Sequence, residues 1–219
     1  MDRFWALEDM LPFEPRVYWR LFQFGNELAW PAQPLLLAVG AALFAGLLRG
    51  WRPDGRWLGP TLGAVWLWTG WQFVALGYGA VNWAAPWFAW GFYAEATLLA
   101  ALGLTGRLVF SRQAPGAHAG LSLLAAALFA WPLLAGLDGR GWREAEIAAI
   151  APDPTAIATL GLVALALRSR WTVLLCIPPV LWLSLSTLTL LTMGAWQGWA
   201  VLAALTTGLT ALQLRPRSL

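Results

Sequence analysis

The sequence predicts an all-α, polytopic transmembrane helix bundle of about seven helices, with the N-terminus outside and the C-terminus in the cytoplasm. Hydrophobic residues make up 59% of the chain and charged residues only 11%, with a mean hydropathy of +0.62. A soluble domain of 219 residues has too little interior to bury that much apolar surface. Apolar runs also recur at lengths near the roughly 20 residues that cross a ~30 Å hydrocarbon core. Arginines gather in alternate loops between these runs, as in multi-pass membrane proteins.

Seven apolar runs are expected to pack as a single integral membrane domain over residues 1–219. The chain divides into an outer interfacial segment (1–27), a transmembrane bundle (28–214) and a cytoplasmic tail (215–219). The fifth run is shorter than the others, with 13 residues after Pro154. The predicted spans are Leu28–Leu48, Leu58–Gly79, Ala84–Thr105, Ala119–Leu137, Thr155–Leu167, Trp171–Leu191 and Trp196–Leu214.

The distribution of arginine predicts the orientation of this bundle in the inner (cytoplasmic) membrane of a cell. The loops after the first, third and fifth spans and the C-terminal tail carry nine arginines and one acid, Asp54. The opposite side carries five arginines and nine acids. By the positive-inside rule the nine-arginine side is cytoplasmic. The fifth run must count as a crossing for Arg215 and Arg217 to lie on that side.

Smaller features agree with a membrane bundle. The stretch from Pro15 to Phe24 alternates apolar and basic residues, which predicts a short interfacial helix that Pro15 begins. No early apolar core with a cleavage site is present, so we expect no removable signal peptide. Many of the 17 tryptophans fall near span ends, as in an aromatic belt. Gly59 and Gly63 have the small-xxx-small spacing that lets two helices approach closely.

Several function classes are excluded by residues that the chain lacks. All 14 basic residues are arginine, so there is no Schiff-base lysine and no Walker-type lysine. One cysteine, Cys176, and one loop histidine, His118, cannot form a disulfide, a Cys/His zinc site or bis-His haem ligation. We therefore expect no metal and no cofactor, and an enzyme is the least favoured class. The net charge of +3 comes from topogenic arginines, so no nucleic-acid partner is expected.

Three stretches of the chain are shared with a known family. They are the run from Phe13 to Phe22 continuing into Trp30–Gln33, then Asn82–Ala85, and Pro152–Gly161 with the later Ile177–Pro178. Together they resemble a bacterial family of small multi-pass membrane proteins of unknown function. The resemblance covers nearly the whole chain, and the Pro-Asp-Pro-Thr stretch is its most specific part. It implies a multi-pass membrane domain and no particular activity.

Glu95 is the only ionisable side chain deep in a predicted span. It lies 11 residues beyond Ala84, or about 16 Å at 1.5 Å per residue, near the bilayer midplane. A carboxylate there costs ~2.5 to 3.5 kcal/mol, so it should face the bundle. It is either a proton or cation site or a protonated hydrogen-bond donor between helices. The tight hairpin of the second and third spans predicts Trp68, Thr69 and Gln72 as its partners.

The fifth span is expected to begin at Asp153, below the outer surface. Asp153 followed by Pro154 and Thr155 is typical of an N-cap and first helical turn. The run gives only about 21 Å of helix, shorter than the ~30 Å core. Either this buried helix start holds an anionic group, or it is a short tilted helix that Asp153 alone satisfies. Arg140 and Arg143 are the nearest outer arginines in sequence, so one of them is expected beside Asp153.

Most polar residues fall on the outer side, so any site is expected to open outward. One hypothesis is a transporter-like or small-ligand-binding protein. The other is a non-catalytic structural or assembly subunit of a larger membrane complex, which packs on partners or binds lipid, quinone or pigment. The expected partners are the lipid bilayer and either a small molecule or another membrane protein. The candidate polar site consists of Glu95, Trp68, Thr69, Gln72, Asn82, Arg140, Arg143, Asp153 and Thr155.

Overall fold

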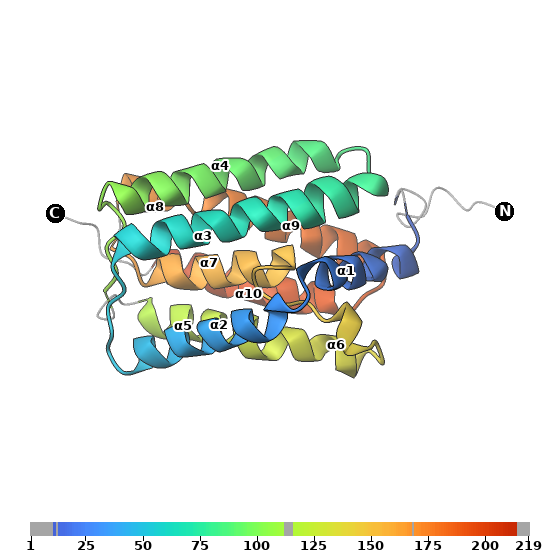
Figure 1. Ribbon diagram of the computed structural model, residues 1–219, viewed down its shortest axis with the longest axis horizontal. Coiled ribbons are helices and arrows are strands. Elements are labelled where there is room, and N and C mark those ends of the chain that lie inside the picture. Colours follow the sequence, from blue (N-terminus) through green and yellow to red (C-terminus); the bar gives the residue numbers. More distant parts are fainter. Residues whose placement is uncertain (1–10, 12, 112–115, 168, 214–219) are drawn as a thin grey trace.

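The computed structural model describes residue 11 and residues 13–111, 116–167 and 169–213, and this part of the chain is all-helical apart from two isolated β-bridges. The long helices after α1 lie roughly along one common direction (Figure 1). We call the end that carries α1 (Pro15–Ala29) and residues 138–151 the α1 end. The opposite end carries the connections 49–54 and 105–111 and is called the loop end.

Each of the seven predicted spans is helical over most of its length. Among the described residues, Ala85–Leu104, Ala117–Leu137 and Arg170–Thr192 are long and apolar enough to cross a membrane. Further crossings and the direction of the bundle stay predictions. The helical elements after α1 are α2 (Ala32–Leu48), α3 (Gly55–Thr69) with its continuations η2 (Gly70–Gly77) and η3 (Tyr78–Ala80), α4 (Ala85–Leu104), α5 (Ala117–Ala125) with η4 (Ala126–Ala130), η5 (Trp131–Leu133) and α6 (Leu134–Leu137), then η6 (Trp142–Glu144), α7 (Pro152–Ala164), α8 (Arg170–Leu174), α9 (Ile177–Thr192) and α10 (Gln197–Gln213).

The predicted interfacial helix exists and is longer than expected. It runs as α1 from Pro15, which occupies its first turn, to Ala29, and it meets α2 at an angle of 91°. Leu28 and Ala29 therefore belong to α1, and the first apolar helix begins at Ala32 instead of Leu28. Pro31 has no N–H with which to continue the hydrogen-bond ladder of α1, so the chain turns there.

The short helix α7 is the central helix of the bundle. Of its 13 residues only Ala158 is not buried. It packs against α5, α9 and α10 and more lightly against α3. Its approach to α5 is close, since a Cβ on Gly161 would lie 2.7 Å from the carbonyl oxygen of Gly120. A helix that is buried at all but one position need not reach both surfaces of the bundle, which agrees with its short length.

The helices α3 and α4 form the most closely packed pair. A Cβ on Gly59 would lie 2.6 Å from the Cα of Gly103, and one on Gly63 would lie 2.6 Å from the carbonyl oxygen of Ala96. The predicted close approach through Gly59 and Gly63 is confirmed, because any larger side chain at either position would meet backbone atoms.

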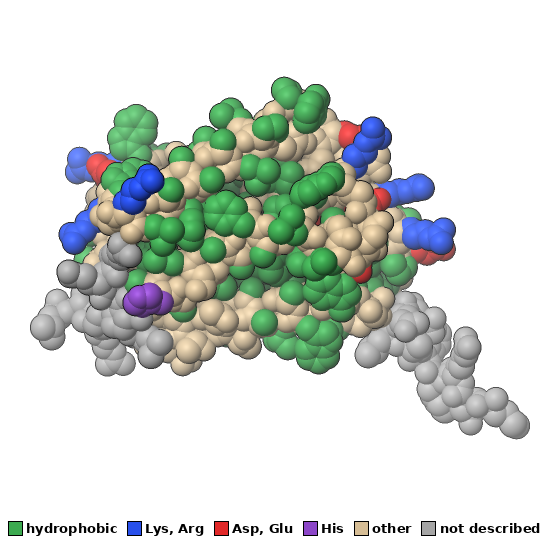
Figure 2. All heavy atoms as spheres, turned by 90° about the horizontal axis from the view of Figure 1, so that it is seen from below, with side chains coloured by type: hydrophobic (Ala, Val, Ile, Leu, Met, Phe, Trp, Pro, Cys, Tyr) green, Lys and Arg blue, Asp and Glu red, His purple; other side chains and the backbone are tan. Residues whose placement is uncertain are grey.

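Most surface charges lie near the two ends of the bundle, whereas Glu95 is buried within α4. Figure 2 shows the surface charges at either end of one face, with hydrophobic side chains across its middle. The connections at the loop end are joined by bridges from Asp54 to Val109 and from Phe110 to Ala166. The alternate loops that carry most arginines therefore meet at one end, as predicted. Four arginines of this predicted set lie outside the described residues: Arg112, Arg168, Arg215 and Arg217.

Candidate functional site

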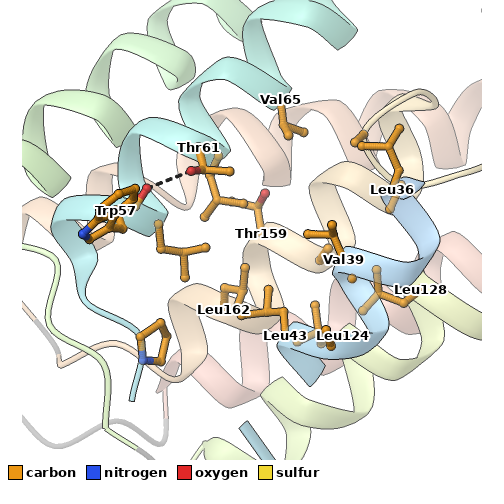
Figure 3. Close-up of a pocket in the computed structure, with 18 of the residues that line it drawn as sticks. Leu36, Val39, Leu43, Trp57, Thr61, Val65, Leu124, Leu128, Thr159 and Leu162 are labelled. Atoms are coloured by element: carbon orange, nitrogen blue, oxygen red, sulfur yellow. Dashed lines mark hydrogen bonds between the residues drawn. The ribbon is translucent and has the colours of Figure 1, made fainter. Parts of the chain in front are cut away.

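A groove of about 860 Å³ runs between α2 and α3, with α7 and α5 beneath it (Figure 3). Its size is within the range typical of ligand pockets. The hydroxyl of Thr61 donates to the carbonyl of Trp57 at 2.9 Å, so it offers the groove no free donor. Most of the other lining side chains are hydrophobic, so the groove is lined mainly by apolar surface. The principal lining side chains are Leu36, Val39 and Leu43 of α2, Leu58, Leu62 and Val65 of α3, Leu124 and Leu128 below α2, and Ala158 and Leu162 of α7.

The groove exists because α2 touches the rest of the bundle over a narrow strip. Only Gly40 and Leu47 of α2 are buried. A Cβ on Gly40 would lie 2.7 Å from Cδ2 of Leu128, so glycine sets the distance at which α2 packs there. Ala158, the one incompletely buried residue of α7, faces the groove with a single methyl group. Gly40 thus lets α2 pack closely on Leu128, and the small side chain of Ala158 leaves the space beside it open.

Asp153 lies in the first turn of α7 and binds α9. Its carboxylate accepts a hydrogen bond from the indole Nε1 of Trp182 at 2.7 Å and another from the hydroxyl of Ser186 at 2.6 Å. Trp182 and Ser186 are four residues apart and share one face of α9. Asp153 is 1% exposed. Both of its oxygens are thus satisfied, and they join the start of the central helix to α9.

Two expectations about Asp153 are wrong. It is not the N-cap of α7, since the helix begins one residue earlier and Ala151 occupies the cap position without a side-chain bond. Neither Arg140 nor Arg143 pairs with it among the described contacts. Pro152 and Pro154 also lack N–H groups, which removes donors that an anion site at this helix start needs.

Thr155 satisfies the backbone ahead of α7 in place of Asp153. Its hydroxyl accepts from the Ala149 N–H at 2.8 Å and donates to the Ala151 carbonyl at 2.7 Å. Ala149 has a φ of 74°, a left-handed conformation that costs a residue with a side chain. Thr69 donates to the Ala149 carbonyl at 3.2 Å. These bonds hold the segment before α7 in one conformation.

The predicted partners of Glu95 are wrong. Thr69 bonds the segment before α7, Gln72 donates to the Ile150 carbonyl at 2.6 Å, and Trp68 packs on Trp71 with ring centroids 5.5 Å apart. Glu95 is fully buried, and neither of its carboxyl oxygens has a hydrogen-bond partner within the described part of the chain. Counting residues predicted the depth of these side chains along their helices. It did not predict the direction in which Trp68, Thr69 and Gln72 point.

Arg140 belongs to a second polar cluster at the α1 end. Its guanidinium lies 3.7 Å from Glu146 and 3.4 Å from Asp138, and it stacks 3.6 Å above the ring of Trp19. Glu146 also accepts a hydrogen bond from the indole of Trp131 at 3.1 Å. This cluster joins α1, η5 and the connection before α7.

The ionisation of Glu146 is perturbed in this cluster. Burial raises the pKa of Glu146 to about 8, and the nearby Asp153 carboxylate raises it as well. The Arg140 guanidinium and the hydrogen bond from Trp131 act in the opposite direction and lower it. Burial is the largest of these effects, so Glu146 takes up its proton well above the usual pH for a glutamate.

Asn82 and Arg143 lie apart from both clusters. The side chain of Asn82 accepts from the Ala84 N–H at 2.9 Å, which closes the turn before α4. Arg143 contributes its carbonyl to a hydrogen bond from Asn26 Nδ2 at 2.9 Å. Its side chain lines a second pocket of about 570 Å³ at the α1 end, beside Asn26, Trp30 and Gln33.

A family model matches residues 15–218 of the chain. The chain belongs to DUF6064, a family of unknown function. No curated protein and no solved structure matches it. The resemblance to an uncharacterised family is therefore confirmed. In this DUF6064 protein the most specific stretch of the resemblance, Pro152–Thr155, forms the start of the central helix.

Sequence reasoning missed the residues that complete the Asp153 site in this DUF6064 member. Trp182 and Ser186 bind Asp153 from α9, and Asn26 joins α1 to the connection before α7. One signal was present, because Ser186 recurs with Thr189 at helical spacing inside an apolar run. That spacing indicates a face turned toward other helices, but it does not identify the partner.

Proposed function

We propose that this DUF6064 protein is a multi-pass protein of the inner membrane that binds a small apolar or amphiphilic molecule in the groove between α2 and α3. The observation that carries the proposal is the groove itself, about 860 Å³ of mostly apolar lining. Three helices long and apolar enough to cross a membrane support the location, as do charges gathered at the ends of the bundle.

The groove favours a ligand that enters from the lipid phase. Val39 and Trp57 on its two walls are exposed at the surface of the bundle, so the groove opens sideways. In a membrane that surface meets hydrocarbon, where an apolar or amphiphilic molecule is concentrated. The hydroxyls of Thr61 and Thr155 in the lining already have backbone partners. Apart from Arg52 and Asp54 of the 49–54 connection, the lining therefore selects by shape and apolar contact.

The polar groups give less support to transport of a polar substrate. Asp153 is satisfied by α9, and Glu146 is held by Arg140 and Trp131. Carboxylates that bind neighbouring helices in this way stabilise the bundle. Of the two roles in the first hypothesis, we therefore favour binding of a small ligand over transport.

A structural or assembly subunit is the second candidate, and one observation favours it. The helix α2 has large exposed side chains such as Leu35 and Val39, while Trp87 and Trp90 are exposed on α4. A helix of another membrane protein that packs beside α2 would cover the same groove. The two candidates therefore predict different occupants of one site.

Native mass spectrometry after purification in a mild detergent tests the proposal. The wild-type protein should carry a stoichiometric small molecule. Ala158→Phe places a ring in the groove and should release that molecule, while Ala203→Phe on the exposed face of α10 should retain it. A stable protein partner that Ala158→Phe displaces, with no small molecule, contradicts ligand binding and favours the assembly role.

Cysteine labelling tests the predicted orientation. After replacement of Cys176, a cysteine at position 54 should be protected from an impermeant reagent in intact cells, and one at position 141 should react. The two positions lie at the loop end and the α1 end respectively. The reverse pattern contradicts the orientation while leaving the groove proposal intact.

A further inference from the structure

The second pocket, at the α1 end, has a different chemistry from the groove. Its volume is about 570 Å³, and it lies where the end of α1, the start of α2 and the segment around η6 meet. It contains both charged and aromatic side chains. The lining residues are Asn26, Glu27, Trp30, Gln33, Pro34, Trp142, Arg143 and Ile147.

Two amide oxygens in this pocket lack donors. Asn26 donates from Nδ2 to the carbonyls of Arg143 at 2.9 Å and Ala145 at 2.8 Å, which fixes the orientation of its amide. Its Oδ1 is buried and accepts from no described residue, and Asn26 as a whole is 6% exposed. Gln33 donates from Nε2 to the Asn26 carbonyl, and its Oε1 is likewise buried without a described donor. The pocket therefore needs a ligand that donates hydrogen bonds.

The charged groups of the pocket define the ligand further. Glu27 lines the pocket, and its carboxylate accepts from Gln23 Nε2 at 2.8 Å through one oxygen, which leaves the other oxygen for a ligand. Together with the two amide oxygens it gives three acceptor groups, one of them anionic, which suit a primary ammonium. Arg143 lines the same pocket, and its guanidinium forms no ion pair with a described acid, so it is available for a phosphate. Trp30 and Trp142 are 70% and 71% exposed. Indoles exposed at this level are typical of a membrane interface.

The pocket and the groove are lined by neighbouring residues of the same two segments. On α2, Gln33 lines the pocket, while Leu36, Gly40 and Leu43 line the groove at spacings of three and four residues, so all four lie on one face. From Gln33 to Leu43 this face covers about 15 Å at 1.5 Å per residue, about half of the ~30 Å core. Ile147 lines the pocket, and the next residue lines the groove.

We propose that one phospholipid occupies both sites, with a primary-ammonium head group in the α1-end pocket and an acyl chain in the groove. This inference rests on the proposed function and specifies its ligand. The ammonium donates to Asn26 Oδ1, Gln33 Oε1 and the Glu27 carboxylate. The phosphate binds Arg143. A free zwitterion has the same head-group chemistry, but it leaves the apolar groove empty, so the lipid is the better match.

A lipid titration followed by native mass spectrometry tests the inference. The probes are phosphatidylethanolamine and phosphatidylcholine with identical acyl chains, which have equal net charge, while the choline head has no N–H donor. The wild-type protein should bind phosphatidylethanolamine about tenfold more tightly, because a charge-assisted hydrogen bond contributes roughly the 1.4 kcal/mol that corresponds to that factor. Glycerophosphoethanolamine, the head group without acyl chains, should compete weakly.

Matched variants separate the head-group site from general lipid binding. Gln33→Leu and Glu27→Gln should each bring the ratio of the affinities for phosphatidylethanolamine and phosphatidylcholine close to one. Glu14→Gln, which removes an exposed carboxylate outside the pocket, should leave the preference unchanged. Arg143→Gln should weaken binding of both lipids, and Arg16→Gln should not.

The outcomes distinguish this inference from the proposed function. Equal binding of both lipids that Ala158→Phe abolishes overturns the head-group assignment and leaves the groove proposal standing. If glycerophosphoethanolamine competes as well as the intact lipid, the acyl chains add nothing to binding, and the claim that the ligand is a lipid is overturned. If the wild type retains neither lipid and no other small molecule, both the inference and the proposed function are overturned.

Discussion

Replacing Asp153 with alanine should destabilise the protein strongly. The substitution leaves the Trp182 indole N–H and the Ser186 hydroxyl buried without an acceptor, since Asp153 accepts from both at 2.7 and 2.6 Å. Each unsatisfied buried donor costs about 1 to 3 kcal/mol, so the free energy of unfolding should fall by about 2 to 6 kcal/mol. Asp153→Asn should cost less than about 1.5 kcal/mol, because its amide can accept from Trp182 and donate to Ser186.

Reversible unfolding in mixed micelles, followed by tryptophan fluorescence, measures these changes. A double-mutant cycle with Trp182→Phe isolates the bond between the two side chains, because phenylalanine keeps a ring and removes the N–H donor. The coupling between Asp153→Ala and Trp182→Phe should be at least about 1 kcal/mol. Ser184→Ala on the same helix serves as a control, since Ser184 bonds only the Val180 carbonyl among the described contacts.

Two results would refute this reasoning. One is an Asp153→Ala variant whose stability lies within about 0.5 kcal/mol of the wild type, the level of a surface substitution. The other is strict additivity with Trp182→Phe, which means that the two side chains do not interact in the membrane-embedded protein.

Three further predictions concern single residues. Because burial raises the pKa of Glu146 from 4.5 to about 8, the folded state keeps a proton that the unfolded chain has released. The contribution of Glu146 to stability should therefore be greatest below about pH 4.5 and fall by up to about 5 kcal/mol as the pH rises to about 8. Glu146→Gln should flatten this dependence when unfolding is measured from pH 4 to 9. Glu95→Leu should raise the midpoint of unfolding by removing a buried carboxyl without a described partner, worth about 1 to 3 kcal/mol, and a lower midpoint would show that the carboxyl is bonded. Ala149→Gly should stabilise the protein by up to about 1 kcal/mol by relieving the positive φ, whereas a loss of stability in the same assay would contradict strain at that residue.

The helices could be predicted from the sequence, but most of their contacts could not. Apolar runs located every long helix to within a few residues, because the length and composition of a run determine whether it can be helical and buried. The shortness of the fifth run was visible, but its central position depends on the helices packed around it. Gly59 and Gly63 gave a correct packing prediction because glycine leaves few alternatives at a close backbone approach.

The candidate site could be predicted only in part. Asp153 was predicted to be the N-cap of α7, which is wrong because Ala151 occupies the cap position and Thr155 makes the bonds to the preceding backbone. The depth of Glu95 follows from counting residues, but its neighbours depend on the rotation of each helix about its axis. The groove could not be predicted at all, since a space between helices is a property of the packed bundle and of no single run.

The burial of α7 at all but one position has a consequence for biosynthesis. In a membrane, a helix that carries Asp153, Thr155 and Thr159 is a poor partner for lipid and relies on its neighbours for its stability. Those neighbours arrive at different times, because α5 is made before α7 while α9 and α10 are made after it. Until α9 emerges, the Asp153 carboxylate has neither Trp182 nor Ser186. Ribosomes that stop short of α9 should therefore leave a chain that quality-control proteases recognise, and completion of α9 should be the step at which the nascent protein becomes resistant to them.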